Sequence, residues 1–165
     1  MSDYVRSKGA PFTAHLLRRL SDELVVAGTL YSKELGIIAP PRTNSTLLLL
    51  DERGELSITD IASILRQSHP LVITWVKQLR ELGLVSTFAD PQDGRRRIVA
   101  ITAAGKEELG RIGPVVTRMG EVCEQLGREA GVDLTGLLAA LDDACRARSV
   151  LDRLRDGPDA REGRT

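Results

Sequence analysis

Apolar residues recur at three- and four-residue steps over long segments near both ends of the chain. Residues 12–35 carry one such stripe, formed by Leu17, Leu20, Leu24, Ala27 and Tyr31. Residues 134–154 carry another, formed by Leu134, Leu137, Leu141, Ala144, Leu151 and Leu154. A helix turns by about 100° per residue, so this spacing places the apolar side chains on one face. Both segments are therefore predicted to be amphipathic helices.

The helix before the last one, from residue 103 to about Arg128, is rich in glycine and contains Pro114. Proline has no backbone N–H and crowds the preceding turn, so it is expected to kink or divide this helix. Glycine weakens helices, so tertiary packing must hold the segment together. The small residues also permit a neighbouring element to approach closely.

The central part of the chain changes from helical to strand-like periodicity. After Pro40 and Pro41, short helices are predicted over residues 46–50, 58–65 and 68–83. Two short β segments follow, 84–89 and 96–102, joined by turn residues 90–94. Two helices joined by a short turn and followed by a hairpin form a winged helix-turn-helix. The predicted fold class is mainly α with a small β-hairpin wing, flanked by N- and C-terminal helices.

Polar residues mark the expected ends of these elements. Ser57 is a plausible N-cap, with Asp60 three residues later near the positive end of the helix. Ser68 can cap the next helix, and Gly83 is a typical helix stop. Thr102 can cap the long helix that follows the hairpin.

The helix over residues 68–83 has two chemically different faces. Its predicted inner stripe consists of Val72, Trp75, Val76, Leu79 and Leu82. Its outer face carries Pro70, Ile73, Thr74, Lys77 and Arg80. A helix that enters the DNA major groove needs an apolar inner face and a polar outer face. Ile73 is the exception, because it is an apolar residue on the side where the groove would lie.

Composition places the chain among soluble globular proteins. It has 165 residues, enough for one domain with helical appendages, of which 42% are hydrophobic and 28% charged. The start of the sequence has no apolar leader, and no uncharged stretch reaches the length of a membrane helix, so a cytoplasmic location without membrane contact is expected. Cys123 and Cys145 are too few for a disulfide framework, and burial within helices is favoured over a redox switch.

The net charge of zero, 23 basic against 23 acidic side chains, conceals an uneven distribution. Residues 57–102 hold six basic and four acidic groups, whereas residues 103–165 hold ten and twelve. The basic groups of the central segment gather on the outer helix face and on Arg95, Arg96 and Arg97 at the hairpin. A local basic patch can bind DNA although the whole chain is neutral.

Three stretches within residues 56–109 resemble the MarR family of bacterial transcription regulators: LSITDIASIL, VKQLRELGLV and ADPQDGRRRIVAITAAG. The last contains a wing signature like that of the family, in which an aspartate is followed two positions later by arginine, and a Leu/Ile-Thr pair precedes a glycine. Here these residues are Asp93, Arg95, Ile101, Thr102 and Gly105.

The resemblance implies one MarR-type domain over residues 12–155, with a DNA-reading lobe at 57–102 and a flexible tail at 156–165. It implies a homodimer built from helices 12–35 and 103–155, whose two winged lobes read a palindromic operator in double-stranded DNA. The expected DNA contacts are Ser68, His69, Pro70, Ile73, Thr74, Lys77, Asp93, Arg95, Arg96 and Arg97.

Within this set, the resemblance implies that Arg95 enters the minor groove and that Asp93 orients the wing arginines. Strand alternation sends Arg95 and Arg97 to one side and Arg96 to the other. One of the arginines is then free to pair with Asp90 or Asp93. The chain departs from the family pattern at Leu71, Ile73 and Thr74, where small polar, hydroxyl and arginine side chains are common; this removes one strong guanine contact.

The leading functional hypothesis is a dimeric transcriptional regulator, a repressor released by a small-molecule effector. The default effector pocket is a crevice near the first long helix, lined by His15, Arg19 and Trp75. The alternative is a winged-helix ligand-sensing or protein-interaction dimer with weak or no specific DNA binding. No nucleophile–base pair, metal-ligand spacing or phosphate loop is found, so neither an enzyme nor a cofactor or metal is expected.

Overall fold

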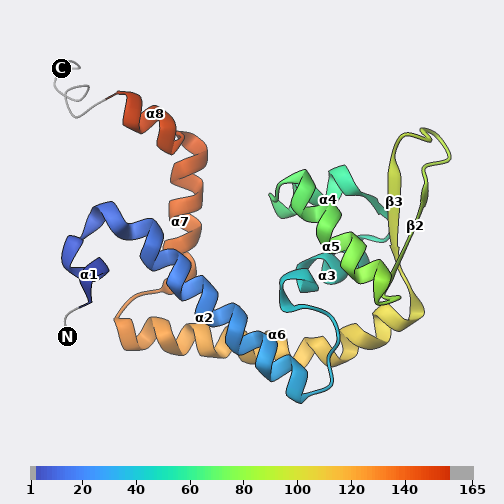
Figure 1. Cartoon of the computed structure of the whole chain (residues 1–165), viewed down its shortest axis with the longest axis horizontal. Coiled ribbons are helices and arrows are strands. Elements are labelled where there is room, and N and C mark those ends of the chain that lie inside the picture. Colours follow the sequence, from blue (N-terminus) through green and yellow to red (C-terminus); the bar gives the residue numbers. More distant parts are fainter. Residues whose placement is uncertain (1–2, 157–165) are drawn as a thin grey trace. The chain divides into compact units, whose positions relative to one another are not determined.

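A computed structural model describes residues 3–156 of the chain (Figure 1). The described residues divide into two compact units, the first ending at Val116 and the second beginning at Thr117. The N-terminal part contains, in chain order, α1 Tyr4–Lys8, η1 Ala10–Phe12, α2 Thr13–Glu34, η2 Pro41–Thr43 and α3 Asn44–Arg53. It is followed by β1 Leu56–Ser57, α4 Ile58–Leu65, α5 His69–Glu81, β2 Val85–Ala89 and β3 Arg97–Ile101. The last helices are α6 Ala103–Ala130, α7 Leu134–Ala147 and α8 Val150–Arg155.

The hydrophobic core lies in the first unit, where α3, α4, α5 and the sheet meet the first half of α6. Its fully buried side chains include Leu47, Leu50, Ile61, Leu79 and Val99. The predicted inner stripe of α5 is confirmed by the burial of Val72, Trp75, Val76 and Leu79. Leu82 is 38% exposed, because α5 ends before it and the helical period stops there.

The wing is a three-stranded antiparallel sheet with strand order β1-β3-β2. β2 and β3 form the predicted hairpin, with Thr87 opposite Val99 and Ala89 opposite Arg97. β1 adds an edge strand, in which Leu56 pairs with Val99. Two residues are too few to show an alternating pattern in the sequence, so this strand was not predicted.

Local backbone and side-chain features set both ends of α4 and the start of α5. Ser57 caps α4 as predicted, since its hydroxyl accepts a hydrogen bond from the N–H of Asp60 at 3.1 Å. Arg66 ends α4 in the left-handed region with φ 53°, which reverses the chain toward α5. Ser68 occupies the N-cap position of α5 with an extended backbone, but in the described chain its hydroxyl makes no capping hydrogen bond.

The start of α6 packs against the corner between α5 and β2. The hydroxyl of Thr102 accepts from the N–H of Gly105 at 3.0 Å and donates to the carbonyl of Gly83 at 2.7 Å. The predicted cap at Thr102 is therefore confirmed. A Cβ on Gly105 would clash with the carbonyl oxygen of Leu84, so this glycine allows the close approach that the sequence suggested.

α6 continues through Pro114 as one helix, so of the kink or division predicted at this proline the division does not occur. The carbonyl that loses its partner belongs to Gly110. Both Gly110 and Pro114 are exposed, so water can take over that hydrogen bond.

The single helix predicted over residues 134–154 is wrong, because the chain breaks between α7 and α8. Arg148 is extended with φ −153°, and Ser149 begins a new helix. The Ser149 hydroxyl accepts from the N–H of Asp152 at 3.1 Å and donates to its carboxylate at 2.6 Å. This local cap competes with a continuous helix.

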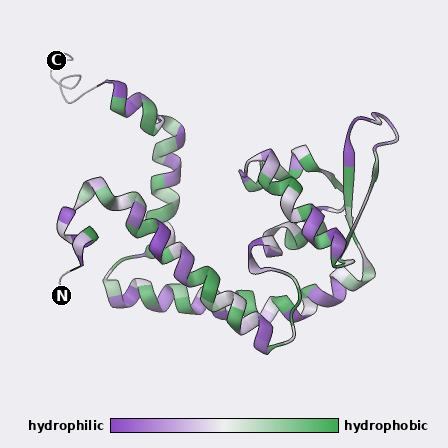
Figure 2. Cartoon of the chain, in the orientation of Figure 1, coloured by the Kyte–Doolittle hydropathy of each residue, from purple (hydrophilic) through white to green (hydrophobic). Residues whose placement is uncertain are grey.

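Both C-terminal helices are amphipathic and uncovered, and hydrophobic and hydrophilic residues alternate along them (Figure 2). Within residues 134–155 no side chain of α7 or α8 is buried. Asp156 ends α8, and the remainder of the tail predicted at 156–165 lies outside the described residues.

The N-terminal helix α1 was not predicted, because five residues are too short for a periodic pattern. Asp3 caps it by accepting from the N–H of Val5 at 3.0 Å. The same side chain forms an ion pair with Arg19 on α2 at 2.6 Å. Much of α2 is exposed, including Val26 and Leu30. Over the described chain, no helix is long and apolar enough to span a bilayer.

Candidate nucleic-acid interface

The outer face of α5 is exposed as the sequence predicted. Ile73 is 45% exposed, and Lys77 lies one turn further along, 3.9 Å from the exposed carboxylate of Glu81. The hydroxyl of Thr74 donates to the carbonyl of Pro70 at 3.0 Å, which leaves the oxygen able to accept from an outside donor. This face therefore presents an apolar group, a hydroxyl and a cation.

A groove with a volume of about 370 Å³ separates α5 from the wing. Its lining consists of Ile58, Ile73, Val76, Lys77, Arg80, Thr87 and Arg97. Three of these side chains are cations, and the described lining contains no carboxylate. Such a groove attracts anions, and the phosphate backbone of nucleic acid is the polyanion that clustered Lys and Arg commonly bind.

Strand register explains why Arg97 faces this groove. Arg97 and Val99 lie two residues apart on β3, so their side chains leave the same face of the sheet. Val99 is fully buried in the core, whereas Arg97 lies beyond the edge of the core and is exposed. The Arg97 side chain therefore continues the row of β3 side chains that packs against the helices.

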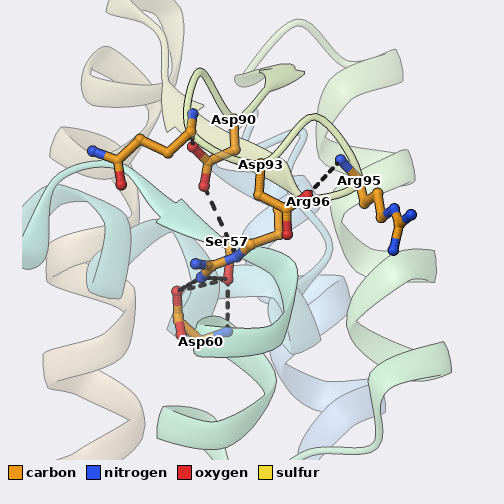
Figure 3. A network of polar contacts seen from close by, with 7 residues as sticks. Ser57, Asp60, Asp90, Asp93, Arg95 and Arg96 are labelled. Carbon is orange, nitrogen blue, oxygen red and sulfur yellow. Dashed lines mark hydrogen bonds and ion pairs between the residues drawn. The ribbon is translucent and has the colours of Figure 1, made fainter.

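Arg96 points to the opposite side and ties the wing to the start of α4 (Figure 3). Its Nη2 donates to Asp60 Oδ2 at 2.9 Å and to Ser57 Oγ at 3.0 Å. Its Nε lies 3.9 Å from Asp90 Oδ2. The prediction that one wing arginine pairs with Asp90 or Asp93 is confirmed, and the arginine is Arg96.

The Asp60 carboxylate is stabilised in its charged form. The hydroxyl of Ser57 donates to it at 2.6 Å, and this hydrogen bond, together with the charge of Arg96, lowers the pKa of Asp60 below its ordinary value. Ser57 thus serves the helix cap and the anchor of the wing at the same time. The ion pair with Arg96 persists throughout the neutral pH range.

Carboxylates shape the wing turn through the backbone. Asp93 Oδ1 accepts from the N–H of Arg95 at 3.0 Å, and Asp90 Oδ1 accepts from the N–H of Gln92 at 2.8 Å. Asp93 therefore orders the backbone of Arg95, and through it the direction of the side chain. Figure 3 shows the Arg95 side chain extending away from the Arg96 network.

All of the residues predicted to contact DNA are exposed: Ser68, His69, Pro70, Ile73, Thr74, Lys77, Asp93, Arg95, Arg96 and Arg97. The structure brings Ile73, Lys77 and Arg97 together in the groove and directs Arg96 elsewhere. The sequence reasoning omitted Arg80 and Thr87 from the site. Arg80 was detectable, because it follows Lys77 by three residues on the same helix face.

The three residues predicted to line an effector pocket lie in different environments. His15 is exposed on α2, and Arg19 is paired with Asp3. Trp75 is only 7% exposed on α5, and its Nε1 has no partner among the described residues. Of the residues described, these three line neither the groove beside the wing nor a second cavity of about 340 Å³ at the turn between α6 and α7.

The second cavity contains Cys123, which is half-buried, whereas Cys145 on α7 is exposed. Across residues 3–156, no three His, Cys, Asp or Glu side chains gather in the manner of metal ligands.

The order of α4, α5 and the three-stranded wing defines a winged helix-turn-helix protein. Residues 43–96 match the model of the MarR family. This match contains the helix-turn-helix and β2, and it ends at Arg96, directly before β3. The family and the relatives described next are transcriptional regulators and not enzymes.

Among curated proteins, the chain is similar to the HTH-type transcriptional repressor IacR from Pseudomonas putida, with 33% identity over 73 residues. That similarity spans 44% of this chain and 44% of the repressor.

Two solved structures share the fold. One is MepR from S. aureus in complex with DNA, at 22% identity and a TM-score of 0.66, covering 80% of this chain and 97% of MepR. The other is PcaV from Streptomyces coelicolor in complex with its natural ligand, at 21% identity and a TM-score of 0.63, covering 92% of this chain and 99% of PcaV.

Proposed function

We propose that this chain is a dimeric, sequence-specific DNA-binding transcriptional regulator of the cytoplasm, and that it represses until a small-molecule effector releases it. The observation that carries the proposal is the cationic groove between α5 and the wing, with Lys77, Arg80 and Arg97 on its lining. It coincides with the two elements that reach DNA in winged helix-turn-helix proteins.

In this proposal, the N-terminal half of α5 reads the major groove. Ser68, His69, Pro70 and Thr74 are exposed toward it, and Ile73 supplies an apolar surface suited to a thymine methyl group. Arg95 at the wing turn enters the adjacent minor groove, where the potential is most negative. Arg97 and Arg80 contact phosphate, while Arg96 holds the wing in place.

The proposed dimer forms through the terminal helices. α7 and α8 expose Leu141 at 49%, Leu151 at 54% and Leu154 at 74%. Apolar stripes of this extent in a globular protein require a partner. A second copy of the chain supplies an identical stripe, and two lobes held together can read the two halves of a palindromic operator.

The effector part of the proposal requires that the protein adopt two conformations, one that fits DNA and one that does not. A small molecule can weaken binding only if it prefers the conformation that does not fit DNA. Trp75 offers a buried, unpartnered N–H, and His15 and Arg19 remain the proposed polar partners on α2. The fold similarity to PcaV, whose structure holds its natural ligand, supports a search for such a molecule.

A binding experiment tests the DNA-reading part. A duplex is selected from a random pool with the wild-type protein, and fluorescence anisotropy is measured over a salt series. Arg95→Ala and Arg97→Ala are each expected to weaken binding and to reduce the salt slope by about one unit. The matched control is Arg128→Ala, an exposed arginine on α6 that should leave the slope unchanged.

A second candidate function is favoured by the exposure of Leu71 at 36% and Ile73 at 45% on the outer face of α5. These apolar groups also suit a protein-interaction or ligand-sensing dimer. Affinity no tighter than about 10⁻⁶ M for every duplex at about 150 mM salt would favour that candidate. Sub-micromolar, sequence-dependent binding would reject it.

A further inference from the structure

Glu108 on α6 is a buried charge that the proposed DNA interface does not use. Among the residues that the structure describes, it is the only buried carboxylate, with 2% of its surface exposed. Carboxylates are rarely buried unless they are paired or hydrogen-bonded, because losing hydration is costly. Its position therefore requires a structural reason.

The reason lies in the loop between α2 and η2. Glu108 Oε1 accepts hydrogen bonds from the N–H of Ile38 at 2.6 Å and from the N–H of Ala39 at 3.0 Å. The next two residues are Pro40 and Pro41, which have no N–H group. One carboxylate oxygen thus satisfies two successive backbone donors, which no aliphatic side chain can do.

The other oxygen faces the surface. Glu108 Oε2 lies 3.2 Å from Arg111 Nη1, one turn further along α6, where the arginine side chain is 56% exposed. Ile112 and Val115 follow on the same side of α6 and are buried in the core. The other buried residues on this face of α6 hold the helix by apolar packing, which has no preferred direction. Glu108 is the polar residue of this face, and its hydrogen bonds are directional.

We infer that Glu108 is a positioning residue: by holding the Ile38–Ala39 loop against α6, it fixes the direction in which α6 leaves the DNA-reading lobe, and so the half-site spacing that the dimer accepts. This inference rests on the proposed function. α6 continues as one helix beyond Glu108. In the proposed dimer, a rotation of α6 at Glu108 would therefore change where each α5 stands. Apolar contacts permit such a rotation, whereas two hydrogen bonds to one oxygen do not.

The test measures spacing preference rather than affinity alone. The palindromic duplex selected by the wild-type protein is remade with its centre shortened or lengthened by one base pair. Glu108→Asp shortens the side chain and so draws the carboxylate away from the Ile38–Ala39 loop. Glu108→Leu removes both carboxylate oxygens. Each is expected to reduce the ratio of affinities between the best and the altered spacings by about two- to thirty-fold, the range of typical coupling changes.

Two further variants separate positioning from stability. Glu108→Gln keeps an amide oxygen for both N–H donors and should retain the wild-type spacing profile. Ile112→Val destabilises the same face of α6, and should lower Tm by a few degrees without altering the profile. All measurements are made well below the lowest Tm, and Glu108→Asp carries the test if Glu108→Leu does not fold.

The outcomes are distinct. If Glu108→Asp and Glu108→Leu lose affinity equally at every spacing, as Ile112→Val does, Glu108 is structural only and the inference is overturned while the proposed function stands. If the wild-type protein selects no duplex, the proposed function fails and the inference fails with it.

Discussion

Arg96 Nη2 lies 2.9 Å from Asp60 Oδ2, which joins the wing to the first turn of α4. The same guanidinium contacts Ser57, the residue that caps this helix. Two of the three consecutive wing arginines thus remain available for an outside partner, and the middle one is part of the scaffold. This contact joins the wing to the helix-turn-helix.

Replacing Arg96 by alanine should loosen the wing with little effect on global stability. The ion pair is about half exposed, and such pairs contribute about 0.2–1 kcal/mol. Amide hydrogen exchange is the measurement: the N–H of Asp90, which donates to the carbonyl of Arg96, should exchange faster. Arg95→Ala is the control and should leave exchange unchanged. Equal exchange rates in both variants would contradict an anchoring role for Arg96.

Adding one methyl group at Gly105 should destabilise the lobe. The new Cβ would overlap the carbonyl oxygen of Leu84, which directly precedes β2, so α6 or this segment must shift, at a cost of about 1–3 kcal/mol. The control is Gly110→Ala on the same helix, where a Cβ meets nothing within 4 Å. That change should stabilise the protein by about 0.5–1 kcal/mol. Chemical denaturation of both variants checks the opposite signs.

Stability should fall in acid partly through Asp60. The Ser57 hydroxyl and the charge of Arg96 lower the pKa of Asp60 in the folded protein. This carboxylate therefore adds stability above its ordinary pKa, and the gain is lost as the pH falls below about 4. Urea unfolding of the wild type and Asp60→Asn over a pH series is the measurement. The two curves should converge in acid, and a constant separation would show that Asp60 titrates normally.

The left-handed backbone at Arg66 predicts a difference between two substitutions. Glycine adopts φ 53° freely, whereas a β-branched residue is strained there. Arg66→Gly and Arg66→Val both remove the arginine side chain and its contacts. The difference between their stabilities therefore measures the cost of the left-handed backbone conformation. The valine variant should be less stable by about 1–2 kcal/mol, measured by thermal unfolding. Equal Tm values would mean that the turn rearranges.

Local periodicity and capping chemistry were sufficient to predict most elements of residues 57–102. The helix over residues 58–65, the hairpin arms and the caps at Ser57 and Thr102 all depend on contacts within a few residues, so the sequence contains their signals. The break before α8 was missed, because the heptad-like leucine pattern continues across Ser149 while its cap interrupts the backbone.

Contacts between residues far apart in the chain could not be predicted from the sequence pattern. Nothing in the local pattern links Glu108 to Ile38, which is 70 residues away. The contact between Arg96 and Asp60 joins residues 36 apart, and alternation alone could only indicate that Arg96 leaves on a different side from its neighbours. Arg19 was proposed for a ligand, but a short helix too small to predict brings Asp3 to it.

The alternation of the wing arginines has a consequence for how such a protein can diversify. The side chain that holds the wing is at position 96, and the neighbouring positions 95 and 97 extend outward from the same short segment. If the proposed function holds, exchanges at the outward positions alter what the wing recognises and leave its fold intact. A gene duplicate could thus acquire a new target sequence by changing a few side chains, without any change in backbone.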